Sequence, residues 1–220
     1  MKSTITNPNQ LGFDALLIDA DEANRQGAFE KEYGHLPKTM NEALPFFRSL
    51  IEKHHAAMLA ADIEQVMTLR NEAHKLALRL NNGEPGILAG PDAPGCTLAR
   101  LTLAEEETVP LWGQGGIFTI SASEMRVRIE MDGVFGIGAP YSPWLNFCVR
   151  AVDWHKPFLS ETGFRSFLGI HADLVPGLTP DAFAVKVIEG HVRSQLKGKL
   201  RPIESRYHPV CAGRTQEGLP

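Results

Sequence analysis

The spacing of apolar residues changes twice along this chain of 220 residues, and the change restricts the folds that it can adopt. Helical spacing covers residues 44–80, an alternation of apolar and polar residues covers residues 117–131, and helical spacing returns over residues 183–196. Helical and strand segments that are grouped in this way are typical of an α+β fold. We therefore predict that an N-terminal helical hairpin, residues 45–81, and a C-terminal helix starting at Pro180 pack with one antiparallel sheet.

Three local signals set the expected ends of the hairpin helices. Thr39 and Glu42 have the spacing of a capping box, but Pro45 would disturb a helix already under way, so we expect the regular helix to begin at Pro45. Asp62 is the expected N-cap of the second helix, and Asn82-Gly83 is its expected stop.

Strand patterns predict five segments: Leu98–Leu103, Ile117–Ser121, Met125–Met131, Val134–Ile137 and Leu145–Val152. The Asp132-Gly133 pair separates the third segment from the fourth. A type I turn with a G1 bulge would place Ile129 and Phe135 on one face, so we predict this turn, with Gly133 at positive φ.

The composition, 43% hydrophobic and 22% charged, is typical of a soluble globular protein. We expect one domain over residues 11–208, with a surface helix from about Leu11, after a disordered stretch at 1–10 and before a mobile tail at 209–220. No apolar run approaches the roughly 20 residues that span a membrane, and the N-terminus lacks the apolar core of a secretory signal. A cytoplasmic protein without a membrane partner is expected.

Cysteine and glycine patterns argue against two common kinds of site. Cys96, Cys148 and Cys211 are scattered and odd in number, so neither a disulfide framework nor a structural zinc site is expected, and Cys148 is interpreted as a small buried hydrophobe. The WGQGG stretch, residues 112–116, precedes a strand rather than a helix, which excludes a phosphate loop of the usual kind.

One metal-ligand spacing occurs in the helical hairpin. Glu52 and His55 have the E-x-x-H spacing that di-iron bundles use, but Glu72 and His74 of the next helix do not repeat it. We therefore predict no metal and no cofactor, and we expect His54, His55 and His74 along the rim of the hairpin.

Residues 153–171, DWHKPFLSETGFRSFLGIH, are too polar for a core segment and too aromatic for an ordinary loop. Ser160 is expected to cap a short helix that directs Phe164, Phe167 and Leu168 inward. The candidate binding residues are then those left outside, together with two aromatic residues of a proline-stiffened loop: Trp154, His155, Lys156, Glu161, Arg165, His171, Tyr141 and Trp144.

Two classes of function fit these residues. The favoured one is a non-enzymatic protein that binds a protein or nucleic-acid partner through residues 153–171, with a homodimer as one possible assembly. Residues 186–206 carry six Lys and Arg against two acids, which would suit a phosphate or an acidic partner, although we favour a solvated helix face as their explanation. The alternative is a hydrolase-like enzyme with His155 and Glu161 as acid and base. A deep pocket where these two side chains converge would favour the enzyme, and a flat surface the binder.

Three stretches resemble an uncharacterised family of proteins carried on integrative and conjugative elements of proteobacteria. They are LNNGEPGILAGPDAPG, MRVRIEMDGVFGIGA and VDWHKPFLSETGFRSFLGIHADLVPGLTPDAF, and the likeness extends over about residues 40–200. The resemblance implies a bacterial host and an accessory role on a mobile element. It implies no activity and no catalytic residue.

Overall fold

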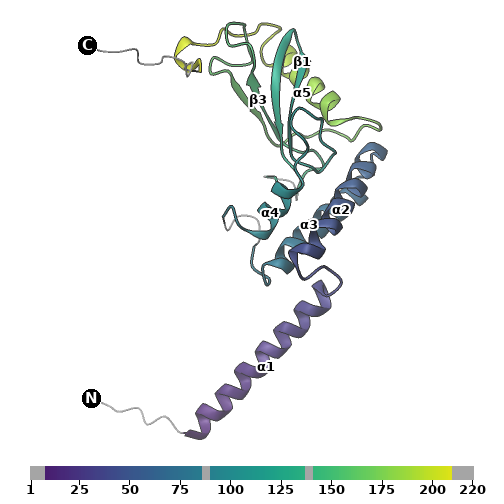
Figure 1. Cartoon of the computed structure of the whole chain (residues 1–220), viewed down its shortest axis with the longest axis vertical. Helices are drawn as coiled ribbons and strands as arrows, with labels where there is room; N and C mark the ends of the chain where they lie inside the picture. Colours follow the sequence, from purple (N-terminus) through teal and green to yellow (C-terminus); the bar gives the residue numbers. More distant parts are fainter. Residues whose placement is uncertain (1–7, 86–89, 137–140, 210–220) are drawn as a thin grey trace, which may run out of the picture.

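The computed structural model describes residues 8–85, 90–136 and 141–209, and its elements confirm the predicted α+β class (Figure 1). In chain order they are α1 (Pro8–Tyr33), α2 (Met40–Ala60), α3 (Ile63–Leu80), α4 (Pro94–Leu101), β1 (Gly116–Ala122), β2 (Met125–Met131), β3 (Phe147–Ala151), β4 (Phe164–Phe167), α5 (Pro180–Ser194) and the 3-10 turn η1 (Ser205–Tyr207). In the described part of the chain, no helix has both the length and the apolar character needed to cross a membrane.

The predicted hairpin is formed by α2 and α3, which lie side by side in Figure 1. Asp62 caps α3 as expected, because its carboxylate accepts a hydrogen bond from the backbone N–H of Gln65 at 3.0 Å. The expected start of α2 at Pro45 was wrong: Thr39 caps the helix by accepting from the N–H of Glu42, and Pro45 lies inside it. Proline removes one helical N–H and costs more than the cap contributes, so the packing of the buried side of α2, which includes Phe47, Leu50 and Ile51, holds the helix through Pro45.

Helix α1 projects away from the rest of the chain in Figure 1. An ion pair between Glu30 of α1 and Arg79 of α3, 2.9 Å long, joins it to the hairpin. The guanidinium of Arg79 holds the pKa of the Glu30 carboxyl below its usual value.

The four strands form an antiparallel sheet in the order β1-β2-β3-β4. The apolar residues of β2 are all buried, and its polar residues are exposed, as the alternation in the sequence predicts. The turn between β1 and β2 is Ser123-Glu124, with φ values of 46° and 65°, and this left-handed backbone matches the primed turns of two-residue hairpins. Cys148, expected to be buried, is half-buried on β3.

Two of the predicted strands were wrong. Residues from Pro94 to Leu101 form α4, where Pro94 occupies the first turn and Leu98 is buried on one side. Val134 and Phe135 lie in a turn outside the sheet, while Ile137 is outside the described residues. The chain leaves the sheet after Met131 because the N–H of Val134 donates to the carbonyl of Gly113 in a distant loop.

Gly133 does not have the positive φ that the predicted turn requires. Its lack of a side chain is needed for a different reason, since a Cβ there would lie 2.9 Å from the carbonyl oxygen of Gly113 and 3.1 Å from the nitrogen of Gly115. The two loops therefore meet backbone to backbone at Gly133.

We predict that Gly133→Ala lowers the free energy of unfolding by about 1 kcal/mol or more, because neither neighbouring backbone segment can move away cheaply. Gly190→Ala is the matched control: a Cβ there meets no atom within 4 Å, and a helical glycine replaced by alanine is stabilising. Urea unfolding followed by circular dichroism measures both, and an unchanged midpoint for Gly133→Ala would contradict the close approach.

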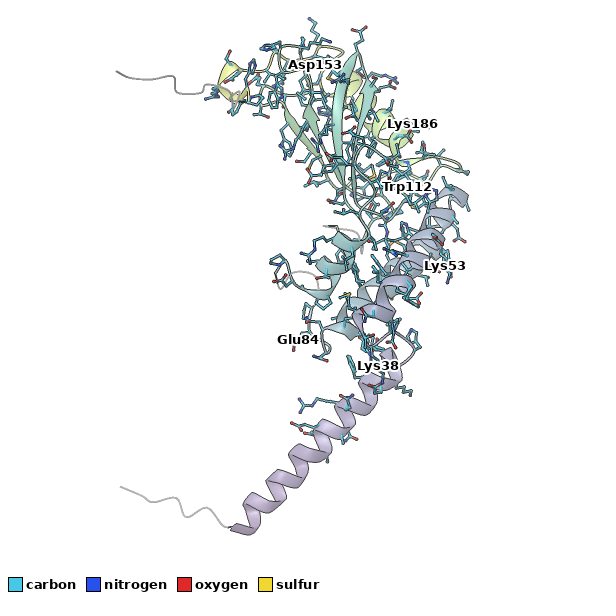
Figure 2. All side chains as sticks on the ribbon, in the orientation of Figure 1. Lys38, Lys53, Glu84, Trp112, Asp153 and Lys186 are labelled. Atoms are coloured by element: carbon cyan, nitrogen blue, oxygen red, sulfur yellow. The ribbon has the colours of Figure 1, made fainter. Side chains whose placement is uncertain are left out.

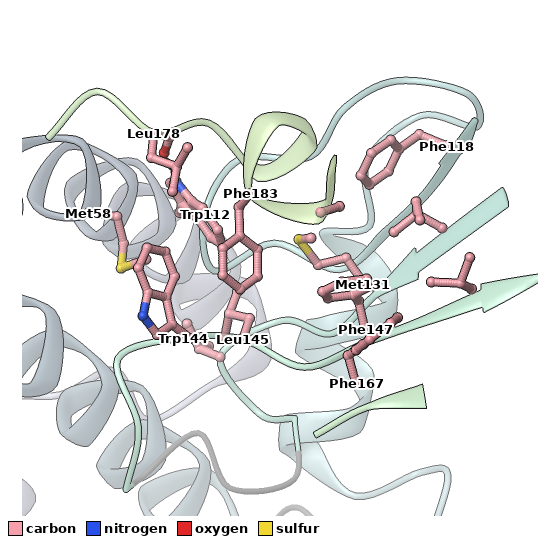
Figure 3. Packing of buried hydrophobic residues seen from close by; sticks show 14 of the residues in the cluster. Met58, Trp112, Phe118, Met131, Trp144, Leu145, Phe147, Phe167, Leu178 and Phe183 are labelled. Carbon is pink, nitrogen blue, oxygen red and sulfur yellow. The ribbon is translucent and has the colours of Figure 1, made fainter. Parts of the chain in front are cut away.

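The core is centred on aromatic rings between the sheet, α5 and the hairpin (Figure 3). The ring centroids of Trp144 and Phe183 lie 4.4 Å apart and stack, and Trp112 meets both rings at a steeper angle. The indole N–H of Trp112 donates to the carbonyl of Leu178 at 2.8 Å, so this buried donor is satisfied. Helix α5 covers one face of the sheet, and Figure 2 places Trp112 where the sheet meets the hairpin.

Candidate binding surface

The segment from Asp153 to His171 starts at the end of the sheet far from the hairpin, where Figure 2 labels Asp153. The predicted short helix was wrong, because residues Phe164–Phe167 form strand β4 and pair with β3. Ser160 closes a turn instead of capping a helix, since its hydroxyl donates to the carbonyl of Phe164 at 2.7 Å. Phe167 points inward as expected, but Leu168 is 61% exposed.

Trp154 is held in place by a glycine. Gly163 has a φ of +68°, and a Cβ there would lie 2.4 Å from the Trp154 ring, so the ring lies directly on the backbone. Trp154 is half-buried, and the rest of its side chain remains accessible. An aromatic ring that is already fixed loses little conformational entropy when it binds a partner.

A histidine from the C-terminal segment completes a group of three rings, Trp154, His155 and His208, which we call the ring cluster. The ring centroid of His208 lies 5.1 Å from that of His155 and 6.3 Å from that of Trp154. The segment that carries His208 is tied down by two backbone hydrogen bonds between Phe158 and Arg201. Sequence reasoning missed His208, because no spacing links it to residues about fifty positions earlier.

Exposed ion pairs surround the ring cluster. Lys156 lies 3.3 Å from Asp153, and Glu161 lies 3.6 Å from Arg201, with more than a third of each side chain exposed. Ion pairs of this kind contribute little to stability and exchange their partners readily. These charges are therefore available to an incoming partner.

His155 and Glu161 do not converge on a common point. His155 turns to the ring of His208, whereas Glu161 turns to the guanidinium of Arg201. Both side chains are exposed, so no enclosed space forms between them. His155 and Glu161 therefore do not form, in this structure, the close acid-base pair that the hydrolase-like alternative requires of them.

The remaining candidate residues lie elsewhere. Arg165 is exposed on β4. Burial of His191 on α5 is the main cause that lowers the pKa of His191, and the charges of Arg165 and Arg201 lower it further. His171 and Tyr141 are exposed on two loops at the hairpin end of the sheet, joined by a hydrogen bond from Ser142 to the carbonyl of residue 170. The predicted residues therefore form separate groups at the two ends of β3 and β4.

Trp144 does not lie on an open surface. It is 3% exposed, stacks on Phe183 and donates its indole N–H to the carbonyl of Ala172 at 2.9 Å. Core packing accounts for this residue, so it is not available to a partner in this structure.

Both neighbouring histidines of α2, His54 and His55, form hydrogen bonds with the backbone of Trp112, which lies in the loop before β1. His54 Nδ1 donates to the carbonyl of Trp112 at 2.9 Å, and His55 Nδ1 accepts from its backbone N–H at 3.0 Å. His54 was expected on the hairpin rim, and that expectation was wrong, because this side chain is fully buried. The WGQGG loop precedes a strand, as predicted, and its hydrogen bonds to α2 also join the sheet to the hairpin.

Arg70 of α3 extends this buried group of residues. Its Nε donates to Nε2 of His54 at 2.9 Å, and its two terminal nitrogens donate to the carbonyls of Ser142 and Pro143. Arg70 is fully buried, which lowers its pKa to about 10. Burial first, and then the charge of Arg70, lower the pKa of His54 to about 3, so His54 is a neutral imidazole with its proton on Nδ1.

We predict that stability falls as the pH is lowered from 7 to 5. An unfolded histidine binds a proton below about pH 6.5, whereas folded His54 stays neutral down to about pH 3. The stability that neutral His54 contributes is therefore complete above pH 6.5 and is lost progressively as the pH falls from 6.5 towards 3. The slope per proton reaches about 1.4 kcal/mol per pH unit at most. His54→Gln should flatten the dependence in urea titrations, while His35→Gln, on an exposed residue, should not.

A hollow of about 500 Å³ lies between α4 and the loops at residues 113–116 and 132–136. Its lining is largely apolar side chains and glycine backbone, and it includes Asp132, whose pKa is raised by burial and by the nearby charge of Glu130. Of the described residues that line it, none is histidine, lysine or arginine. The hollow thus places the Asp132 carboxyl in a largely apolar lining.

Metal ligands are not grouped in the described ranges: no set of three or more His, Cys, Asp or Glu side chains there is arranged to hold an ion. Glu52 of the E-x-x-H pattern is exposed, and His55 is engaged with Trp112.

The chain is similar to Protein KlcB of Escherichia coli. One such protein is 33% identical over 161 residues, which are 71% of this chain and 37% of the relative, and a second of the same name is 33% identical over 156 residues, 70% and 31% of the two lengths. The chain thus spans about a third of the length of the curated relatives it matches. No family model matches the sequence. No solved structure matches it either.

Proposed function

We propose that this chain is a non-enzymatic accessory protein of a bacterial mobile element, acting in the cytoplasm, and that it binds a macromolecular partner through the ring cluster and the charges beside it. The likeness to Escherichia coli proteins named Protein KlcB supports a bacterial host, and the resemblance to a family carried on integrative and conjugative elements supports the mobile-element role. The binding role rests on the structure of residues 153–171 and 199–208.

The observation that carries the proposal is the fixed, accessible Trp154. Its ring is held by Gly163 and lies beside His208, which also contacts His155. One part of Trp154 packs against the core, and the other part is accessible. Tryptophan, tyrosine and arginine dominate binding energy when they are clustered and positioned in advance. The divergence of His155 from Glu161 favours binding over the hydrolase-like alternative.

The triple variant Trp154→Ala, His155→Ala, Lys156→Ala of the full chain is expected to lose partner recovery by about tenfold or more, since hot-spot residues contribute about 2 kcal/mol each. The measurement is crosslinking in host cells followed by purification and quantitative mass spectrometry. Thermal unfolding should show a cooperative transition close to that of the wild type.

The control replaces three exposed residues on other elements, Leu101, Lys186 and Arg193, by alanine. Equal loss of recovery in the control would contradict the proposal. An unfolded triple variant would be replaced by His155→Ala, Lys156→Ala, which leaves the Trp154 contact intact. Full recovery by that double variant would also count against the surface.

A further inference from the structure

One face of the sheet is covered by α5, and the opposite face carries exposed and half-exposed side chains. We call this opposite side the open face. Its residues follow from strand alternation and register: Ile117, Thr119 and Ser121 of β1, Arg126, Arg128 and Glu130 of β2, Cys148 and Arg150 of β3, and Phe164 and Ser166 of β4.

Two arginines lie directly opposite each other on the open face. Arg128 of β2 pairs in register with Arg150 of β3, and Arg126 lies two residues earlier on the same side. Like charges in this cross-strand position repel each other. Glu106 lies 3.2 Å from Arg128 and Glu130 lies 4.0 Å from Arg150, but these pairs are exposed and weak. An added anion between the arginines would relieve the repulsion.

The surface between these arginines is hollowed. A depression of about 200 Å³ is lined by Ile117, Arg128, Glu130 and Arg150. An aromatic ring lies beside it, because the guanidinium of Arg150 sits over the ring of Phe164, 4.7 Å from its centroid. The row Thr119, Arg128, Arg150, Phe164 crosses all four strands, a width of about 15 Å at the usual strand spacing.

We propose that the open face binds single-stranded nucleic acid. Arg128 and Arg150 contact a phosphate, for which the planar guanidinium is suited, and Phe164 with the Arg150 plane above it offers a stacking surface to an unpaired base. An acidic protein segment would use the two charges but would gain nothing from the ring. The proposal goes beyond the ring cluster and does not depend on it, because the two surfaces share no residue.

Fluorescence anisotropy of a labelled 20-nucleotide mixed-sequence oligonucleotide, as DNA and as RNA, tests the proposal with the full chain. Arg128→Gln, Arg150→Gln is expected to weaken binding by about tenfold or more and to reduce the slope of log K against log salt by about 0.7, because one phosphate is no longer neutralised. Phe164→Ala is expected to weaken binding at least about fivefold. The DNA and RNA arms show which backbone is preferred.

The matched control is Lys186→Gln, Arg193→Gln, which removes the same charge from α5 on the other side of the sheet. Wild-type affinity in this control supports the open face. The proposal is overturned if the wild type does not bind, if both pairs weaken binding equally, or if polyglutamate competes as well as unlabelled oligonucleotide, which would indicate an acidic protein partner. Should the first pair fail to fold, Arg128→Lys, Arg150→Lys keeps the charge and is expected to retain salt-dependent binding with lower affinity.

Discussion

Replacing Arg70 by Met is expected to lower the free energy of unfolding by about 3 kcal/mol or more. The substitution keeps much of the side-chain volume but leaves three acceptors without their donor: the buried carbonyl of Ser142, the buried Nε2 of His54 and the partly buried carbonyl of Pro143. A buried polar group without a partner costs about 1 to 3 kcal/mol. The expected loss is a large part of the stability of a typical domain.

Urea unfolding, followed at the same pH for both proteins, measures this loss. Arg48→Met is the matched control, since Arg48 is an exposed arginine on α2, and its replacement should change stability by less than about 0.5 kcal/mol. Equal stability of Arg70→Met and the wild type would contradict the network and show that His54 and the loop carbonyls find other partners.

Trp112→Ala is expected to be the most destabilising single change, at about 4 kcal/mol. It removes a fully buried indole that contacts the rings of Trp144 and Phe183 and satisfies the carbonyl of Leu178. The cavity left by the indole and the unpaired carbonyl of Leu178 both contribute to the loss of stability. The backbone contacts of Trp112 with His54 and His55 do not require the indole, so they limit the damage.

Graded variants separate these contributions. Trp112→Phe keeps an aromatic ring but loses the indole N–H, so its loss should be smaller than that of Trp112→Ala. Tyr141→Ala, at a position 89% exposed, should leave the unfolding midpoint unchanged. Similar midpoints for Trp112→Ala and Tyr141→Ala would show that the core does not depend on the Trp112 ring.

Local signals predicted the presence of α2, α3 and α5 and the central strands, because their determinants lie within a few residues. Asp62 caps its own helix, and the alternation from Met125 to Met131 reports one buried face. The turn was misplaced because Asp132-Gly133 is the stronger sequence signal, while the true hairpin turn uses Ser123 and Glu124, residues that seldom adopt positive φ.

The candidate site was predicted only in part. Trp154 and His155 are accessible, as expected, but their grouping depends on Gly163 and on His208 from the C-terminal segment. Phe164 and Phe167 have a spacing that fits a helix, and only pairing with β3 decides that they form a strand. Long-range contacts of this kind leave no local pattern in the sequence.

The buried Arg70 has a consequence for the order of folding. Helices α2 and α3 are neighbours in sequence, so their mutual contacts can form early, but the acceptors of Arg70 at Ser142 and Pro143 lie more than seventy residues further along the chain. Until the loop with Ser142 and Pro143 packs against α3, the guanidinium of Arg70 stays hydrated at a position that is buried in the folded protein. A fragment ending at residue 85 would therefore lack the partners that its own interior requires. Cooperativity between the helical and sheet parts then arises from one side chain that neither part can bury alone.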